Sequence, residues 1–100
     1  MGKLSGEEIG KELKALPTWR HEAPAITRLF QFKDFVAAIK FVNAIATEAE
    51  KANHHPDIDI RWNIVILRLT THDSGGLTKK DFALARVCED LGGKHGANRS

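Results

Sequence analysis

The chain has 100 residues, with little cysteine and no long apolar run. Its single cysteine, Cys88, excludes an internal disulfide and a metal cage built from cysteines. Because Cys88 shares a stripe at helical spacing with Leu84 and Leu91, we expect a small core residue rather than a catalytic thiol. No apolar run approaches the roughly 20 residues of a membrane-spanning helix. The sequence therefore predicts no contact with a membrane.

A surplus of charge of one sign is also missing, since 15 basic residues face 13 acidic ones. No basic stripe is interleaved with aromatic residues, so direct nucleic-acid binding is not expected. The first residues lack the apolar segment of a signal peptide, and Gly6 stands where N-myristoylation needs Ser or Thr. We therefore expect a cytoplasmic location. The length and the 42% share of hydrophobic residues are typical of one soluble globular domain.

Local signals predict two helices in the first half of the chain. Ser5 followed by Glu8 forms a capping box that starts the first helix, and Pro17 stops it. Asp34 is expected to cap a long helix that reaches about Ala52.

A third helix is predicted near the end of the chain. Thr78 and Asp81 repeat the capping box, and the apolar spacing fades after Leu91 into the segment GGKHGANRS. We therefore predict one domain over residues 1–92 and a disordered tail over residues 93–100.

Two pairs of short alternating segments predict β-hairpins. AITRLFQF follows a turn at Pro24, and DIDIRW is separated from IVILRLTT by Asn63. The order α-β-β-α-β-β-α needs no parallel crossover. It predicts an α+β fold, a four-stranded antiparallel sheet with helices packed on one face.

The long helix carries more apolar surface than one small sheet needs. Two stripes lie side by side, and either core packing or a contact between subunits would explain the surplus. The first stripe comprises Phe35, Ala38, Ile39, Val42, Ile45 and Ala49. The second comprises Ala37, Phe41 and Ala44.

Three of the five histidines, His54, His55 and His72, lie at the ends of predicted elements. Together with Asp73 they would suffice in number as ligands of a metal ion. However, Pro56 favours an extended backbone at the preceding residue, and the side chains of neighbouring residues then point apart. We therefore expect no metal site.

Two kinds of proton chemistry could use the histidines of this segment. A nucleophilic triad of the neighbours His72, Asp73 and Ser74 could hardly form the linear hydrogen-bond chain that it needs. General acid–base catalysis suits imidazole better, because imidazole titrates near neutral pH. From the residues alone, a role as ordinary polar residues at loop ends stays equally open.

Three further residues have ordinary structural explanations. Glu50 lies one turn before His54, where a solvated helix residue is expected. Asp81 is explained by its capping box. Trp19, like Trp62, is more often a packing residue than a stacking platform for a ligand.

The spacing of these residues resembles the pterin-4a-carbinolamine dehydratase family. Glu50 precedes the run HHP by four residues, Trp62 follows its proline by six, His72 comes ten later, and Asp81 nine after that. The segments LPTW, FQFKDF and THDSGGLTKKD resemble the family too. The resemblance covers residues 4–91.

The resemblance implies an α+β enzyme that dehydrates 4a-hydroxy-tetrahydropterin to quinonoid dihydropterin and water. In the family this reaction recycles tetrahydrobiopterin for aromatic amino acid hydroxylases, with no metal and no other cofactor. It implies that His54 and His72 are the main acid–base pair and that His55 belongs to the site. The residues implied to bind or orient the substrate are Glu50, Pro56, Asp73, Asp81 and Trp19.

The resemblance also implies self-association. Family members are homodimers or homotetramers, here expected to form through the long helix and a sheet edge. Mammalian members additionally serve as dimerisation cofactors of a homeodomain transcription factor through the same helix face. A non-enzymatic interaction module that uses Phe41, Ala37 and Ala44 is therefore the alternative function.

Overall fold

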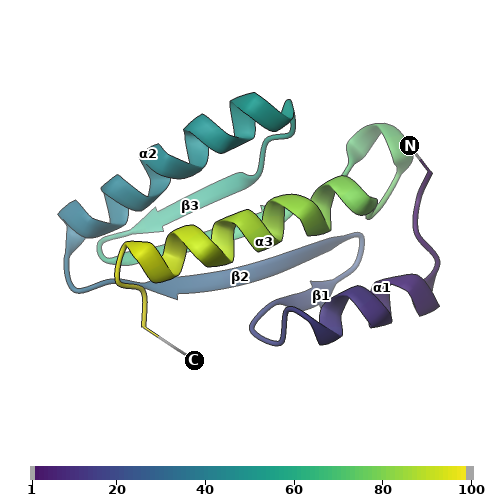
Figure 1. Ribbon diagram of the computed structural model, residues 1–100, viewed down its shortest axis with the longest axis horizontal. Coiled ribbons are helices and arrows are strands. Elements are labelled where there is room, and N and C mark those ends of the chain that lie inside the picture. The colour runs from purple at the N-terminus through teal and green to yellow at the C-terminus, as the bar shows by residue number, and fades with distance from the viewer. Residues whose placement is uncertain (1, 99–100) are drawn as a thin grey trace.

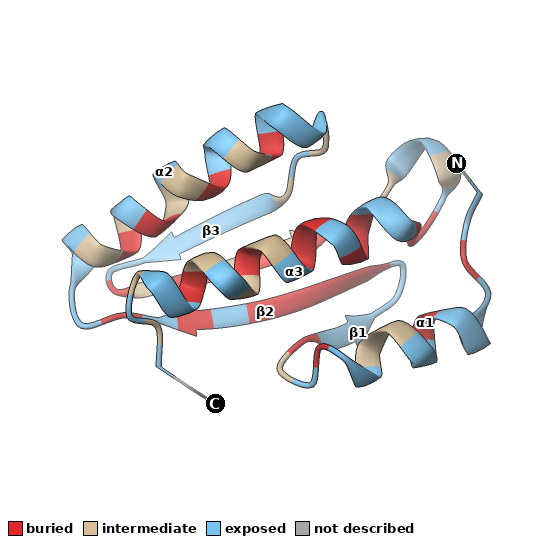
Figure 2. Ribbon diagram, viewed as in Figure 1, coloured by how far each residue is buried: buried red, intermediate tan, exposed pale blue. Residues whose placement is uncertain are grey.

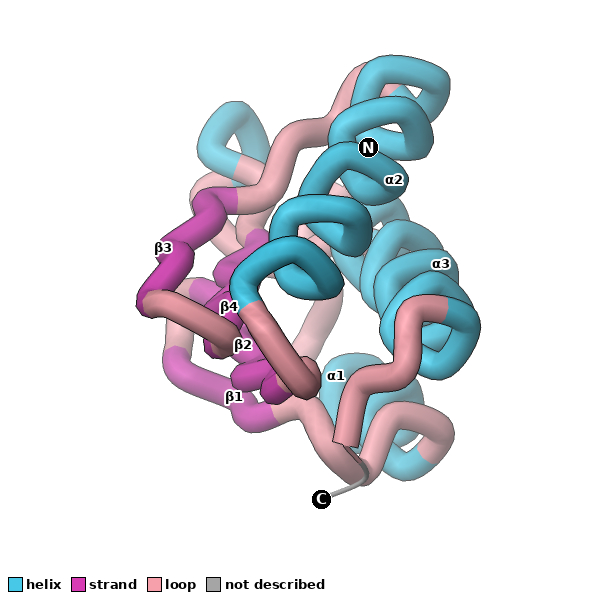
Figure 3. Tube along the Cα trace, turned by 90° about the vertical axis from the view of Figure 1, so that its left-hand side faces the viewer, coloured by secondary structure: helices cyan, strands magenta, loops and turns pink. Residues whose placement is uncertain are grey.

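In the computed structural model, residues 2–98 form one four-stranded sheet and three α-helices. The elements are α1 (Gly6–Lys14), β1 (Arg20–Glu22), β2 (Ala25–Gln31), α2 (Phe35–Ala52), β3 (Asp57–Arg61), β4 (Ile64–Leu69), the 3-10 turn η1 (His72–Ser74) and α3 (Lys79–Lys94). The strands are antiparallel throughout, in the order β1-β2-β4-β3. The helices form a second layer on one face of the sheet (Figures 1 and 3). The predicted α+β fold is confirmed.

The predicted helix starts are found where the capping residues stand. The Ser5 hydroxyl accepts a hydrogen bond from the Glu8 amide, and the Glu8 carboxylate accepts one from the Ser5 amide. Asp34 caps α2 through the amide of Ala37 at 2.8 Å. Thr78 and Asp81 form the second capping box, at the start of α3. Each box satisfies amides that a helix N-terminus leaves without a partner inside the helix.

The side of helix α2 that faces the sheet combines residues from both predicted apolar stripes. Phe41 is 0% exposed, and its ring packs against Phe30 and Phe32 with centroid distances of 4.7 and 4.9 Å. Assigning Phe41 to a spare contact face was therefore wrong. Phe35, a member of the first predicted stripe, is 51% exposed. The buried residues of α2 are Ala38, Phe41, Ile45 and Ala49.

The buried face of β2 includes a charge. Arg28 points to the helix layer, where its Nε donates to Oε1 of Glu89 at 2.7 Å, and the Thr18 hydroxyl donates to the same oxygen at 2.6 Å. Burial alone would raise the pKa of Glu89, but the hydrogen bonds from Arg28 and Thr18 outweigh it and lower the pKa below its ordinary value. The arginine thus bridges the sheet to α3 instead of disrupting the core.

Cys88 is fully buried among the core residues of α3, as predicted. Burial raises the pKa of its thiol to about 12. The thiol is therefore protonated near neutral pH, and a protonated thiol is neither a nucleophile nor a metal ligand.

Helix α3 continues to Lys94, so the prediction that it ends near Leu91 was wrong. Gly92 is buried against Phe30 and allows the helix to pass close to the sheet. Beyond the helix, the amide of Ala97 donates to the carbonyl of Gly92 and the amide of Asn98 donates to that of Gln31, each at 2.8 Å. Residues 93–98 of the predicted tail thus form helix and backbone hydrogen bonds; positions 99 and 100 lie outside the described residues.

The neighbours Gly92 and Gly93 offer a matched pair of substitutions. A Cβ atom at Gly92 would lie 2.7 Å from Cε2 of Phe30, whereas one at Gly93 would meet nothing within 4 Å. We expect Gly93→Ala to stabilise the fold by up to about 1 kcal/mol through helix propensity. Gly92→Ala should instead destabilise it by about 1–3 kcal/mol through overpacking. Urea unfolding of both variants measures the difference, and equal effects would contradict the close packing.

Strand β3 forms one edge of the sheet and is exposed along its whole length (Figure 2). Ile58 and Ile60 pair with the buried Leu67 and Val65 but are each 38% exposed. Trp62, at the following turn, has a positive φ of 53° and is 71% exposed. No helix within residues 2–98 has the length and apolarity that crossing a membrane requires.

Candidate active site

Three segments that are distant in the sequence meet at one end of the molecule. They are the C-terminal end of α2, the loop after β4 and the N-terminal end of α3 (Figure 1). Between them lies a pocket of about 310 Å³. Its lining residues are Asn53, His54, His55, Thr70, Thr71, His72, Asp73 and Lys80. The structure therefore brings together all three predicted catalytic histidines and Asp73.

The end of α2 directs its two histidines into this pocket. Asn53 adopts the left-handed conformation, with φ 49° and ψ 43°, and the amide of His54 donates to the carbonyl of Ala49 at 3.1 Å. Asparagine enters this region more readily than most residues and therefore commonly ends helices. The chain turns sharply here, and Pro56 then leads into β3.

His54 is held by a buried carboxylate. Its Nε2 lies 2.6 Å from Oδ1 of Asp81, and the two side chains are 11% and 0% exposed. The other oxygen of Asp81 accepts hydrogen bonds from the Thr78 amide at 2.9 Å and from the Thr71 hydroxyl at 2.8 Å. Asp81 therefore caps α3 and contacts a pocket histidine with the same carboxylate, a double role that the capping pattern alone does not reveal.

The contact with Asp81 determines which ring nitrogen of His54 carries the proton. A carboxylate only accepts hydrogen bonds, so the nitrogen of His54 that faces Asp81 is assigned the proton. In the neutral ring the other nitrogen, Nδ1, is then a proton acceptor. The buried pair thus fixes both the position and the tautomer of His54.

His55 has a similar but exposed partner. Its Nε2 lies 2.5 Å from Oε2 of Glu50, and the two side chains are 56% and 76% exposed. Pairs in contact with water contribute little to stability. Glu50 can therefore orient His55, but it holds that ring less firmly than Asp81 holds His54.

The loop that carries His72 is closed at its base. The amide of Thr71 donates to the carbonyl of Gly76 at 3.1 Å, and Gly75 takes a left-handed conformation with φ 73°. His72 and Asp73 form the first turn of η1 and are exposed at the pocket. A tight loop of this kind positions its side chains better than an open one.

Two predicted site residues are not at the pocket wall. Trp19 is only 5% exposed and packs in the core, its ring 6.3 Å from that of Phe30 in an edge-on arrangement, so the structure does not place it as a wall of the histidine pocket. Pro56 is half-buried and shapes the backbone after His55 without lining the pocket.

Four lining residues were not singled out from the sequence: Asn53, Thr70, Thr71 and Lys80. Asparagine at a helix end is a recognised signal for a left-handed cap, so Asn53 could have been found. Thr71 and Lys80 carry no such signal, because their importance depends on the spatial approach of the β4 loop to α3.

Within residues 2–98, no three histidine, cysteine, aspartate or glutamate side chains come together as ligands of one metal ion. Each paired histidine has its Nε2 directed at a carboxylate instead. The pocket thus gathers imidazoles, the side chains that general acid–base catalysis uses most often.

Fold and pocket together define a small α+β protein with an imidazole-lined pocket at one end of its helix layer, the class to which the pterin dehydratases belong. The family model described as pterin 4 alpha carbinolamine dehydratase matches residues 2–91. The chain therefore belongs to this family, as its motifs predicted.

Relatives match the chain over nearly its full length. A protein of Acidobacterium capsulatum, provisionally named pterin-4-alpha-carbinolamine dehydratase, is 54% identical over 91 residues, which are 91% of this chain and 99% of that protein. One from Chloroflexus aurantiacus, named in the same provisional way, is 53% identical over 93 residues, 93% of this chain and 100% of the relative.

Solved structures share the fold. A crystal structure from Brucella melitensis, described as a transcriptional coactivator/pterin dehydratase, is 36% identical with a TM-score of 0.88, and the match covers 91% of this chain and 99% of that one. A pterin dehydratase-like protein described as a RuBisCO assembly factor in the alpha-carboxysome is 24% identical with a TM-score of 0.66, covering 76% and 90%. The second likeness concerns the fold alone.

Proposed function

We propose that the protein dehydrates 4a-hydroxy-tetrahydropterin to quinonoid dihydropterin and water, in the recycling of pterins for aromatic amino acid hydroxylases. The observation that carries the proposal is the 2.6 Å contact of His54 with the buried Asp81, in a pocket that His55 and His72 also line. Family membership supports a dehydratase. The cytoplasmic location remains a prediction.

The reaction needs one proton donor and one proton acceptor. The C4a–O bond breaks, the departing hydroxyl takes a proton to leave as water, and a ring N–H loses its proton as the new double bond to C4a forms. His54 is proposed as the base, because the contact with Asp81 leaves its Nδ1 as the acceptor. His72, which is exposed and lines the same pocket, is proposed as the acid, and His55 is proposed to complete the site.

A stopped-flow assay tests this proposal. Decay of chemically generated 4a-hydroxy-tetrahydropterin is followed with the protein, and in a control with free imidazole at the same concentration of histidine side chains. We expect the protein to accelerate the decay by at least about 10²-fold over the control, since positioned acid–base groups typically contribute about 10²–10⁴. A folded protein that is no faster than imidazole would contradict the proposed activity.

A second candidate is a non-enzymatic interaction module, and exposed apolar residues favour it. Phe35 and Val36, at the start of α2, are 51% and 60% exposed, and the edge strand carries Ile58 and Ile60. Unpaired strand edges and exposed apolar residues are typical of protein contacts. The same residues support self-association as a homodimer or homotetramer.

Analytical sedimentation of the protein in solution measures the mass of the oligomer. We expect an oligomer whose mass falls in the variant Ile60→Lys, because a charge opposes burial of the strand edge. Asp59→Lys is the matched control, since Asp59 lies on the same strand but on the other face of the sheet. A monomeric protein, or an unchanged mass of Ile60→Lys, would contradict a contact at this edge.

A further inference from the structure

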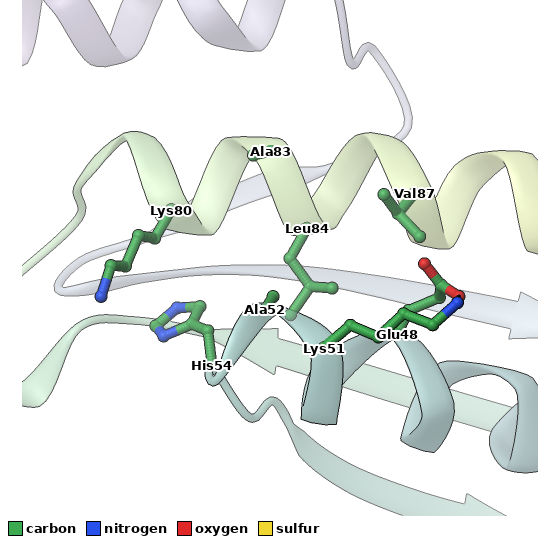
Figure 4. Close-up of a pocket in the computed structure, with 8 residues that line it drawn as sticks. All are labelled: Glu48, Lys51, Ala52, His54, Lys80, Ala83, Leu84 and Val87. Atoms are coloured by element: carbon green, nitrogen blue, oxygen red, sulfur yellow. The ribbon is translucent and has the colours of Figure 1, made fainter.

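A second pocket, of about 300 Å³, lies between α2 and α3 (Figure 4). Its lining residues are Glu48, Lys51, Ala52, His54, Lys80, Ala83, Leu84 and Val87. His54 and Lys80 also line the histidine pocket, so the two hollows adjoin at these side chains. This helix groove is therefore next to the proposed base and is not a remote surface feature.

The chemistry of the helix groove differs from that of the histidine pocket. Its middle is apolar and is formed by Ala52, Ala83 and Leu84, the last of which is 3% exposed. At the end away from His54, Lys51 and Glu48 form an ion pair at 3.2 Å (Figure 4). A ligand that lies in the helix groove would therefore need an apolar body that extends away from the histidines.

The covalent structure of the proposed substrate supplies such a group. In a tetrahydropterin, C4a is bonded to N5 and N5 to C6, so a substituent on C6 begins close to the reacting carbon. With C4a beside the histidines, C6 lies two bonds away, so its substituent can extend into a hollow that adjoins the histidine pocket. The helix groove begins at that border, where His54 and Lys80 line both hollows.

We propose that the helix groove binds the C6 substituent of the pterin and favours substituents with an apolar, aryl-type body over a methyl group. The proposal rests on the proposed dehydratase function and specifies its substrate class. A methyl group would leave most of the groove empty, whereas a ring could pack against Ala83, Leu84 and Val87. The discrimination comes from burial of apolar surface, because the reacting atoms of both substrates are the same.

The experiment compares the 4a-carbinolamines of 6-phenyl- and 6-methyl-tetrahydropterin. We expect kcat/KM to be about tenfold higher for the phenyl compound, which corresponds to burial of about 55 Å² of additional apolar surface. Ala83→Phe fills the helix groove and should remove this preference. Ala46→Phe is the matched control, because Ala46 is exposed on α2 and does not line the groove.

Three results would overturn the proposal: no preference for the phenyl compound, a preference that survives Ala83→Phe, or an equal loss in Ala46→Phe. Binding of the corresponding 6-phenyl and 6-methyl 7,8-dihydropterins, measured by calorimetry, applies the same criteria without turnover. If neither carbinolamine is dehydrated, the proposed activity fails. The calorimetric preference and its loss in Ala83→Phe then decide separately whether the helix groove binds the substituent.

Discussion

Replacing His72 by alanine is expected to slow the dehydration by about 10² to 10⁴, the usual contribution of a general acid or base. The fold should persist, because His72 is exposed on a loop whose closure depends on the backbone hydrogen bond from Thr71 to Gly76. The measurement is kcat/KM for the carbinolamine in stopped flow, with unfolding in urea as the test of the fold.

The chain offers a matched control in His21, which is exposed on β1 and does not line the pocket. His21→Ala should leave both activity and stability unchanged. His54→Ala should lose activity by a similar factor to His72→Ala, since each histidine is proposed to move one of the two protons. Near-full activity of the His72 variant in a folded protein would remove it from the catalytic pair.

The fold could be predicted because its local signals agree with one another. The capping boxes at Ser5 and Thr78, the cap at Asp34 and two alternating hairpins fix the element order, and an antiparallel sheet needs no long-range information beyond that order. Orientation of α2 was harder to predict. Its two apolar stripes adjoin, and only packing against Phe30 and Phe32 shows that Phe41 points inward.

The end of α3 also could not be predicted from local sequence signals. Gly92 and Gly93 look like a helix stop, because glycine has a low helix propensity. The helix passes through them because Gly92 lies so close to Phe30 that an added Cβ atom would be 2.7 Å from its ring. No local sequence pattern encodes that contact. Tertiary packing thus overrides propensity at this point.

For the site, the sequence identified which residue types gather but not how they are connected. His54, His55, His72 and Asp73 line one pocket, as the motif spacing suggested. The contact of His54 with Asp81 joins residues 27 positions apart, and Thr71 enters through a side chain with no distinguishing pattern. Trp19 was misplaced because an indole suits a core and a binding wall equally well.

The second large effect is expected for Asp81→Asn. Asparagine matches aspartate in shape, and its carbonyl oxygen can still accept the hydrogen bond from the Thr78 amide, so the helix cap should be kept. The amide NH₂ group would then face Nε2 of His54 and donate to it. That contact favours the opposite tautomer, in which Nδ1 carries the proton and can no longer accept one.

We therefore expect Asp81→Asn to lower kcat/KM by about 10²-fold or more, as loss of the correct tautomer does in other histidine-based catalysts. Nitrogen chemical shifts of His54 in labelled protein report the tautomer directly, and unfolding in urea reports the cap. Glu50→Gln is the control, because its exposed contact with His55 should matter by less than about tenfold. An active Asp81→Asn protein with an inverted His54 tautomer would show that Nδ1 is not the base, whereas an unchanged tautomer would show that Asp81 does not set it.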